Sequence, residues 1–202
     1  MTVTQAEAVG EHARHAQAAT GHALYLARHG ETNDNREPVR VQGFTDTPLN
    51  DAGRRQAAEL AERVERLAVR SLWSSDLRRA RETAEIVGAR LELPVHLDPR
   101  LREANRGKWE GRLFVDIARE CPERYAAWRR AGAAFRFPGG ESLLEQSERV
   151  SAALEAIRSS TELPALVVCH GGSIRVTLCR GDRRGLDAFH EFAVPNVAVV
   201  PL

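Results

Sequence analysis

The chain has 202 residues, of which 43% are hydrophobic and 28% are charged, a length and balance typical of one well-buried domain. No apolar run approaches the roughly 18 residues that a membrane span needs, and a formal net charge of +1 gives no global field that would attract nucleic acid or anionic lipid. We therefore expect one soluble domain with neither a nucleic-acid nor a membrane partner.

The first 22 residues are rich in alanine and polar side chains. They lack the basic start and apolar centre of a secretion signal, so we predict a flexible N-terminal tail over residues 1–22 and a cytoplasmic protein. Three histidines in this segment have no cysteine or carboxylate cluster at ligand spacing, and we expect no metal there. The three cysteines of the chain are an odd number and widely spaced, which argues against a disulfide framework.

Strand-like and helix-like patterns alternate along the rest of the chain. Five short apolar runs are typical of strands, namely residues 23–27, 71–75, 94–98, 165–169 and 197–202. Three segments with apolar residues at helical spacing predict helices, namely residues 50–68, capped by Asn50 or Asp51, residues 76–91 and residues 142–157. This alternation predicts a single α/β domain over residues 23–202, with three α/β/α layers, a mainly parallel sheet and a ligand at the carboxyl ends of the strands.

Residues 104–141 depart from this alternation. Aromatic residues such as Trp109 and Trp128 are interspersed there with arginines and glycines. We predict a helical lid beside the strand ends. The same aromatic residues could equally cap the core, and the two roles are compatible.

Reactive or cationic side chains follow four of the predicted strands. They are Arg28 and His29 after the first strand, Arg78 and Arg79 in a helix that Ser74, Ser75 or Asp76 would cap, Glu103 after the third strand, and His170 after the fourth. Singly, each has an ordinary structural explanation. Because the carboxyl ends of parallel strands meet at one edge of a sheet, we expect these groups to lie together.

Two histidines, two or more arginines and one carboxylate are the groups that phosphoryl transfer needs. A neutral imidazole can attack phosphorus, while neighbouring guanidinium groups hold the anion and lower the imidazole pKa. We predict His29 as the nucleophile. Arg28, Arg79 and His170 would stabilise the phosphoryl oxygens, and Glu103 would give a proton to the leaving group and then activate water.

These residues occur in motifs that resemble the histidine phosphatase superfamily of phosphoglycerate mutase-like enzymes. In family order, the motifs are "RHGETNDN", "VQGFTDTPLNDAGRRQA", "SSDLRRARETA", "LREANRGKWEG", "FPGGES" and "VVCHGG". The resemblance implies a phosphoglycerate mutase-like fold, the roles given above and no metal or other cofactor. More loosely, it places Asn35, Gln42 and Gly43 beside the substrate, and we add Gly171, which follows the second histidine.

Two departures from the family pattern concern the outcome of the reaction. The chain is short between "HGGSIRV" and "FAVPNVAVV", and the 104–141 segment is compact. A mutase must keep its phosphoenzyme dry, whereas a phosphatase admits water, so compactness favours hydrolysis. We expect a phosphomonoester hydrolase of the broad-specificity branch, acting on a small phosphorylated metabolite. The alternatives are mutase-type phosphoryl transfer and a non-catalytic phosphate-binding module.

Substrate and assembly are less constrained by the sequence. Arg36, Arg106 and Arg136 hint at an acidic substrate, although solvated surface positions would explain each equally well. The oligomeric state stays open between a monomer and a homodimer.

A second motif, "CHGGSIR", overlaps the last one. Cys169 and Arg175 are separated by five residues, the spacing of cysteine-dependent phosphatases. Val168 and Val176 stand where that family usually has a histidine and a hydroxyl residue, and the cysteine ends an apolar run, where thiols are usually inert. We therefore expect Cys169 to be structural.

Overall fold

The computed structural model describes residues 23–130 and 132–202, and the tail predicted over residues 1–22 lies outside them. The sheet has five strands in the order β3-β2-β4-β1-β5. Their bounds are Leu24–Arg28 (β1), Ser71–Ser74 (β2), Val95–Leu97 (β3), Ala165–Cys169 (β4) and Val199–Pro201 (β5). Four strands pair in parallel, as predicted, and β5 runs antiparallel to β1.

Six α-helices and three short 3-10 helices complete the described part of the chain. The α-helices are Asp51–Glu65 (α2), Arg78–Leu91 (α3), Phe114–Glu120 (α4), Pro122–Arg129 (α5), Leu143–Ser160 (α6) and Gly171–Cys179 (α7). The 3-10 helices are Pro99–Leu101 (η1), Gly107–Trp109 (η2) and Gly185–Ala188 (η3). All three predicted helices are confirmed within a few residues at each end. None of the helices in residues 23–130 and 132–202 combines the length and apolar character that spanning a membrane requires.

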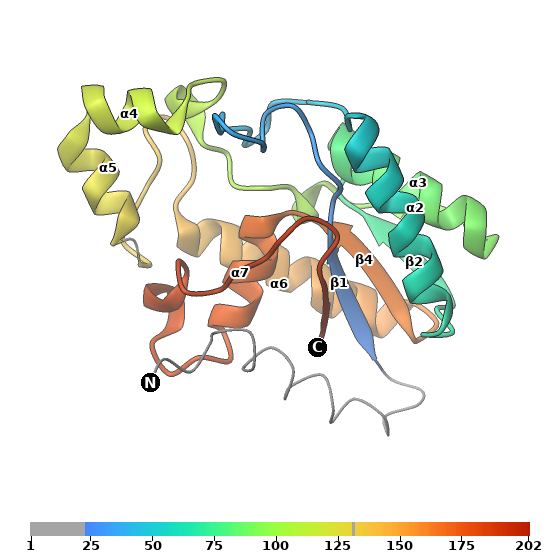
Figure 1. Cartoon of the computed structure of the whole chain (residues 1–202). Helices are drawn as coiled ribbons and strands as arrows, with labels where there is room; N and C mark the ends of the chain where they lie inside the picture. Colours follow the sequence, from blue (N-terminus) through green and yellow to red (C-terminus); the bar gives the residue numbers. More distant parts are fainter. Residues whose placement is uncertain (1–22, 131) are drawn as a thin grey trace, which may run out of the picture.

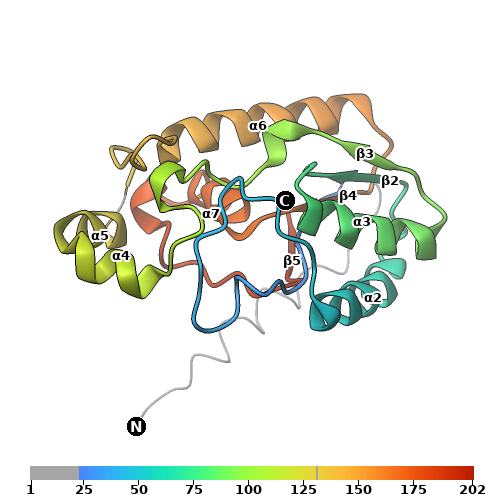
Figure 2. The ribbon, with the colours of Figure 1, turned by 90° about the horizontal axis from the view of Figure 1, so that it is seen from above.

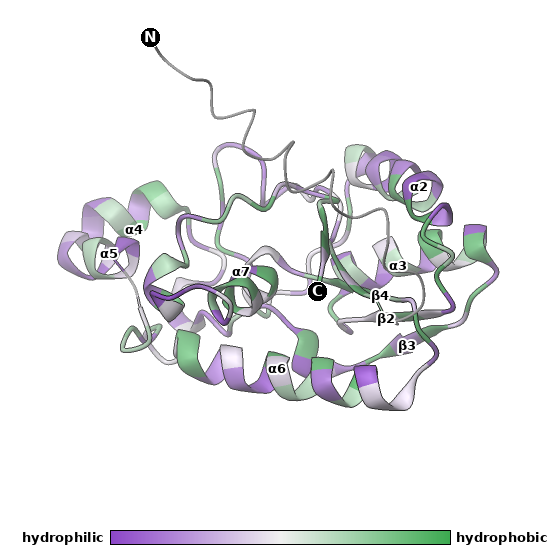
Figure 3. Cartoon of the chain, turned by 90° about the horizontal axis from the view of Figure 1, so that it is seen from below, coloured by the Kyte–Doolittle hydropathy of each residue, from purple (hydrophilic) through white to green (hydrophobic). Residues whose placement is uncertain are grey.

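Alternation along the buried strands separates the core into two clusters. Val167 and Cys169 of β4 pack with α6 and α7, whereas Leu166 and Val168 pack with α2 and α3. Successive strand residues point to opposite faces of a sheet, so the helices form one layer on each side of it (Figure 2). Hydrophilic residues extend along much of α2, while α7 is largely hydrophobic (Figure 3). The predicted α/β/α arrangement is confirmed.

The N-termini of the helices are capped in different ways. The Asn50 side chain accepts a hydrogen bond from the Gly53 N–H at 2.8 Å and caps α2, as predicted. The cap predicted for α3 is wrong, because no side-chain bond is made by its N-cap residue, Leu77. Instead, Asp46 Oδ1 accepts from the Arg78 N–H at 2.6 Å. A loop distant in sequence thus caps α3, an arrangement that local periodicity does not encode.

The 104–141 segment contains η2, α4 and α5, and the last two lie to one side of the sheet (Figure 1). Its aromatic rings pack on each other: Phe114 and Trp128 stack with ring centroids 4.9 Å apart, and Trp109 meets Trp128 edge-on at 6.0 Å. Trp109 and Trp128 belong to the same buried cluster as α6 and α7. The aromatic residues therefore extend the core, as one of the two interpretations proposed.

The buried position of Leu72 gives a test of the packing. This β2 residue is 0% exposed and packs in the cluster with α2 and α3. We expect Leu72→Ala to lower the free energy of unfolding by about 2–5 kcal/mol, because it removes buried methyl groups and leaves a cavity. Urea denaturation measures the change. Leu144→Ala, at a position 45% exposed, should change stability by less than about 0.5 kcal/mol, and equal losses at the two sites would contradict this packing.

Candidate active site

The pairing of β1 with β4 brings the two histidines of the sequence motifs together. Arg28 lies opposite Cys169 in the parallel register, so His29 and His170 follow neighbouring strands at the same edge of the sheet. Their ring centroids are 5.2 Å apart in an edge-on arrangement, and both residues are buried. The predicted convergence of these two histidines is present in the structure.

One ring nitrogen of His29 is bound to the backbone. Nδ1 lies 2.7 Å from the Gly30 carbonyl oxygen, which can only accept, so the hydrogen-bond pattern assigns the proton to Nδ1 and leaves a lone pair on Nε2. Burial lowers the pKa of His29 well below its usual value, and the charges of Arg79 and Arg28 lower it further. The imidazole is therefore neutral near pH 7, with Nε2 free to act as a nucleophile.

Arg28 and Arg79 supply positive charge beside this imidazole. The Arg79 Nη atoms donate to the carbonyls of Thr45 at 2.8 Å and Gly43 at 2.7 Å, and Arg28 Nη1 donates to Val194 at 2.6 Å. Burial lowers the pKa of each arginine to about 10, so both remain charged near pH 7. Gly43 has a φ of +54°, and a Cβ there would lie 2.2 Å from a carboxylate oxygen of Glu110. Glycine is thus required where the backbone receives the guanidinium of Arg79.

His170 is fixed by a serine of the β2–α3 connection. Its Nε2 lies 2.9 Å from Ser75 Oγ, which also accepts a hydrogen bond from the Leu77 N–H at 3.3 Å. Burial, followed by the charge of Arg79, lowers the pKa of His170 well below its usual value. The second histidine is therefore also neutral.

Glu103 lies in the same site as a buried carboxylate. It accepts hydrogen bonds from the Ala104 N–H at 2.8 Å, Gln146 Nε2 at 3.0 Å and the Gly172 N–H at 3.0 Å. Burial alone would raise its pKa, but Arg106, with Nη2 at 3.7 Å, and these hydrogen bonds lower it to about 2. Glu103 is therefore ionised near pH 7 and must gain a proton before it can donate one.

A cavity of about 190 Å³ opens onto His29. All four residues predicted to face the substrate line it, namely Asn35, Gln42, Gly43 and Gly171. The cavity is also lined by residues that were not predicted to lie beside the substrate, including Arg40, Phe114, Trp128 and Arg175. Arg79 and His170 do not line the cavity; both are fully buried, and the charge of Arg79 lowers the pKa of both His29 and His170.

Of the three arginines that hinted at an acidic substrate, only Arg106 lines this cavity. Arg36 is exposed, and Arg136 is exposed and pairs with Glu145 at 2.5 Å. The interpretation as solvated surface positions therefore holds for Arg36 and Arg136.

Several buried N–H groups in and around this cavity have no acceptor among the described residues. They are Arg28 Nε, Arg79 Nε, Arg106 Nε, Asn35 Nδ2, Trp128 Nε1 and, in the tautomer that protonates it, His170 Nδ1. A buried donor without an acceptor is unfavourable. An oxyanion in the cavity would supply acceptors to those donors that belong to its lining residues, among them Arg28, Arg106 and Asn35, because a phosphoryl group presents several oxygens in different directions.

Cys169 does not share in this site. Its side chain packs in the apolar cluster, and burial raises its thiol pKa to about 12. Such a thiol is not a nucleophile near pH 7, so the expected structural role of Cys169 agrees with its surroundings. Arg175, the other half of the cysteine-phosphatase spacing, lines the His29 cavity instead.

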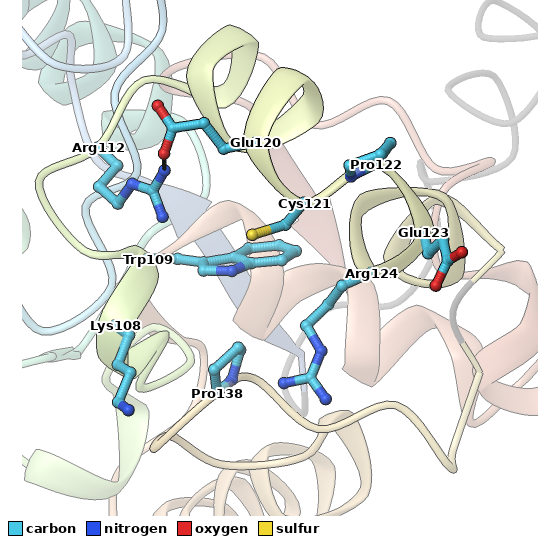
Figure 4. A pocket seen from close by; sticks show the side chains of 9 residues that line it. All are labelled: Lys108, Trp109, Arg112, Glu120, Cys121, Pro122, Glu123, Arg124 and Pro138. Atoms are coloured by element: carbon cyan, nitrogen blue, oxygen red, sulfur yellow. Dashed lines mark hydrogen bonds and ion pairs between the residues drawn. The ribbon is translucent and has the colours of Figure 1, made fainter.

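A larger cavity, of about 510 Å³, lies elsewhere, against η2, α4 and α5 (Figure 4). The ring of Trp109 forms its centre, with the sulfur of Cys121 over that ring, and Arg112 and Glu120 form an ion pair at its edge. It shares no lining residue with the His29 cavity and contains no histidine. Within residues 23–130 and 132–202, no group of three or more histidine, cysteine or acidic side chains could hold a metal ion. The chemical groups therefore gather in the smaller cavity.

Comparison with known proteins agrees with this geometry. The family model of the histidine phosphatase superfamily (branch 1) matches residues 24–202. The chain belongs to this superfamily. The resemblance and the fold that the sequence motifs implied are thereby confirmed.

The names of similar proteins within the histidine phosphatase superfamily include both a mutase and phosphatases. The chain is 44% identical over 156 residues to a probable phosphoglycerate mutase of Escherichia fergusonii, covering 73% of this chain and 69% of that protein. It is 32% identical, with a TM-score of 0.80, to a mycobacterial glucosyl-3-phosphoglycerate phosphatase solved with VO3, covering 89% and 92% of the two chains. A putative alpha-ribazole-5'-P phosphatase of Escherichia coli is 29% identical, with a TM-score of 0.77 and 89% of each chain covered.

The unpaired donors lead to a binding prediction. Inorganic phosphate at about 100 times its Kd should stabilise the protein by about 2.7 kcal/mol, which corresponds to a rise in Tm of about 5–10 °C. Arg79→Gln should lose most of that rise, since it removes a buried cation beside His29. Arg78→Gln is the matched control, because Arg78 is exposed and pairs with Glu82 at 2.6 Å. Thermal unfolding with and without phosphate measures the shift, and equal shifts in both variants would contradict the assignment.

Proposed function

We propose that this protein hydrolyses the phosphomonoester of a small metabolite through a phosphohistidine formed at His29. The observation that carries the proposal is the neutral imidazole of His29, whose Nε2 lone pair is free beside two buried guanidinium groups. Unpaired N–H donors around the cavity support an oxyanion as the group that binds there. The reaction uses the side chains of this chain and has two steps.

In the first step, the substrate phosphoryl group occupies the space beside Arg28, Arg79 and His170. The Nε2 lone pair of His29 attacks phosphorus, a P–N bond forms and the P–O bond to the leaving group breaks. The leaving oxygen takes the bond's electron pair and a proton from Glu103. An arriving phosphate dianion raises the pKa of this carboxylate by like-charge repulsion, so Glu103 can hold that proton in the complex although it is ionised in the free site.

In the second step, Glu103 is a carboxylate again and acts as a base. It takes a proton from water, the water oxygen attacks phosphorus and the P–N bond breaks. The electron pair of that bond returns to Nε2 of His29, and inorganic phosphate leaves. The guanidinium groups stabilise the charge that accumulates on the phosphoryl oxygens in both steps.

The relatives support this reaction class and leave two outcomes to compare. The phosphatase names of two structural relatives favour water as the acceptor. The probable phosphoglycerate mutase is more similar in sequence and favours return of the phosphoryl group to the organic product as the alternative. The short connection between α7 and β5, which includes only η3, supports access of water and thus hydrolysis.

Replacement of the nucleophile tests the chemistry. His29→Ala should reduce phosphate release by at least about 10³-fold, because no phosphoenzyme can form. It should also abolish the acid-labile, alkali-stable phosphoryl label of the wild-type protein. Cys169→Ser should retain activity within about threefold, since a buried thiol of high pKa takes no part. An active His29→Ala protein together with an inactive Cys169→Ser protein would contradict the proposal.

Incubation with 3-phosphoglycerate separates the two outcomes. We expect release of inorganic phosphate, measured with a colorimetric assay, because the phosphoenzyme is open to water. Accumulation of 2-phosphoglycerate, measured by NMR, would instead establish the mutase. Binding without either product, and without turnover of a metabolite panel, would indicate a non-catalytic phosphate-binding module.

A further inference from the structure

Gln146 interrupts the apolar face that α6 turns toward the core. The buried residues of this helix recur at helical spacing, namely Leu143, Gln146, Ser147, Val150, Ala153, Leu154 and Ile157. Position 146 lies within one turn of Leu143 and about one turn before Val150, where this pattern favours an apolar side chain. Gln146 is nevertheless 0% exposed, and a long polar side chain is seldom buried so completely. Both ends of its amide therefore require hydrogen-bond partners.

One end of the Gln146 amide has such a partner and the other does not. Nε2 donates a hydrogen bond to Glu103 Oε1 at 3.0 Å, whereas the amide oxygen is buried and has no partner among the described residues. A buried carbonyl without a donor is unfavourable, and an apolar side chain would avoid that cost. The core thus gains little from this glutamine, and its hydrogen bond to Glu103 indicates a role in the active site.

Gln146 differs in kind from the other groups that contact the Glu103 carboxylate. Oε1 also accepts from the Ala104 N–H at 2.8 Å, and Oε2 accepts from the Gly172 N–H at 3.0 Å. Both of these donors belong to the main chain. Arg106 Nη2 lies 3.7 Å from Oε2, a distance at which the charges attract without a hydrogen bond. Within the part of the chain that the structure describes, Gln146 is the side chain that donates a hydrogen bond to Glu103.

The main chain of Glu103 is held separately by the next turn of α6. Arg149 Nη2 donates to the Glu103 carbonyl oxygen at 2.8 Å, and Arg149 Nη1 donates to that of Arg102 at 2.7 Å. Arg149 is itself held by Glu141, whose Oε2 accepts from Nε at 3.0 Å. Replacement of Gln146 should therefore leave the backbone of Glu103 in place and change only the surroundings of its carboxylate.

We propose that Gln146 is a positioning residue, which orients the Glu103 carboxylate and, by donating to its ionised form, lowers the pH at which Glu103 changes between acid and base. This inference rests on the proposed function. In the first step, the O–H bond of Glu103 breaks and its proton goes to the leaving oxygen. The electron pair stays on the carboxylate, where the Gln146 N–H stabilises it. In the second step, the carboxylate takes a proton from water and this stabilisation is lost.

The other charged and titratable groups around Glu103 come from several elements. They are Arg28 and His29 at the end of β1, Arg79 in α3, Arg106 in the same loop, Arg149 in α6 and Arg175 in α7. Burial would raise the pKa of Glu103, whereas Arg106, the two main-chain donors and Gln146 lower it to about 2. A substitution at position 146 leaves all the other groups in place, so a change in pH dependence reports on the Gln146 amide.

The variant Gln146→Met tests the proposal, because it keeps the length of the side chain and removes the amide. Formation of the phosphoenzyme from glycerol 3-phosphate needs protonated Glu103 and is lost as the pH rises through its pKa. Hydrolysis of the phosphoenzyme needs ionised Glu103 and is lost as the pH falls through its pKa. Loss of a donor to the carboxylate raises both pKa values, so both midpoints should move upward by about one pH unit. Rapid-quench measurements with radiolabelled substrate follow each step separately.

Two further variants and a second substrate separate this role from a structural one. Gln146→Asn keeps an amide but withdraws it by one methylene, and it should move both midpoints in the same direction. Leu154→Ala removes buried methyl groups about two turns further along α6; it should lower the Tm and leave both midpoints unchanged. With 4-nitrophenyl phosphate the leaving phenolate needs no proton, so phosphoenzyme formation should show no such movement in Gln146→Met.

The midpoints also decide against the proposal. If both Gln146 variants reduced the rates equally at every pH and left the midpoints in place, Gln146 would be structural, and the hydrolase would stand without this inference.

An NMR titration of the Glu103 carboxyl carbon gives a readout that needs no turnover. Its resonance is assigned by its absence in Glu103→Gln, and it is followed in the complex with inorganic phosphate. We expect a midpoint about one pH unit higher in Gln146→Met than in the wild-type protein. That difference in a protein that hydrolyses no phosphomonoester would support the Gln146–Glu103 interaction while the proposed function failed. Equal midpoints in the two proteins would overturn the inference.

Discussion

The parallel pairing of β1 with β4 is the constraint on which the site depends. It places the last residues of two buried strands side by side, so that His29 and His170 leave the sheet at the same edge. A shift of one residue along either strand would turn its apolar side chains to the opposite face of the sheet. The two core clusters that separate the helical layers thus also fix the distance between the two imidazoles. Packing and chemistry are determined by the same register.

Burial lowers the pKa of both the histidines and the arginines of the site, but it leaves them with different charges near pH 7. It keeps the imidazoles neutral, because their unperturbed pKa lies close to 7, whereas Arg28 and Arg79 remain charged with a pKa of about 10. Backbone carbonyls of Gly43, Thr45 and Val194 bind part of each cation and leave Nε unpaired. The protein therefore maintains a fixed positive field around an uncharged nucleophile. A substrate anion meets donors that are already oriented, which is the condition for electrostatic stabilisation of a transition state.

Local patterns in the sequence predicted the elements that form this site and the residues at the strand ends. Parallel strands with buried apolar runs, followed by Arg28, His29 and His170, contain enough information to place those residues together. Contacts between distant loops could not be predicted in this way. Asp46 caps α3 from another loop, and Phe114 and Trp128 reach the cavity from a segment whose helices have no strand to position them. The ionised state of Glu103 was also inaccessible, since it depends on three hydrogen-bond donors and Arg106 around a buried carboxylate.

The loop over residues 43–46 has a consequence for how such a protein can diverge. The carbonyls of Gly43 and Thr45 accept hydrogen bonds from Arg79, and the Asp46 side chain caps the N-terminus of α3. The Phe44 N–H donates to Glu110, which also accepts from the Arg106 N–H. A substitution or insertion there would disturb the nucleophile's surroundings, a helix start and the opposite wall together. In contrast, α4 and α5 contribute Phe114 and Trp128 to the cavity wall, but none of the carbonyl groups that bind His29 and Arg79. Natural variation that alters substrate preference without loss of the phosphoryl chemistry has most freedom in these two helices.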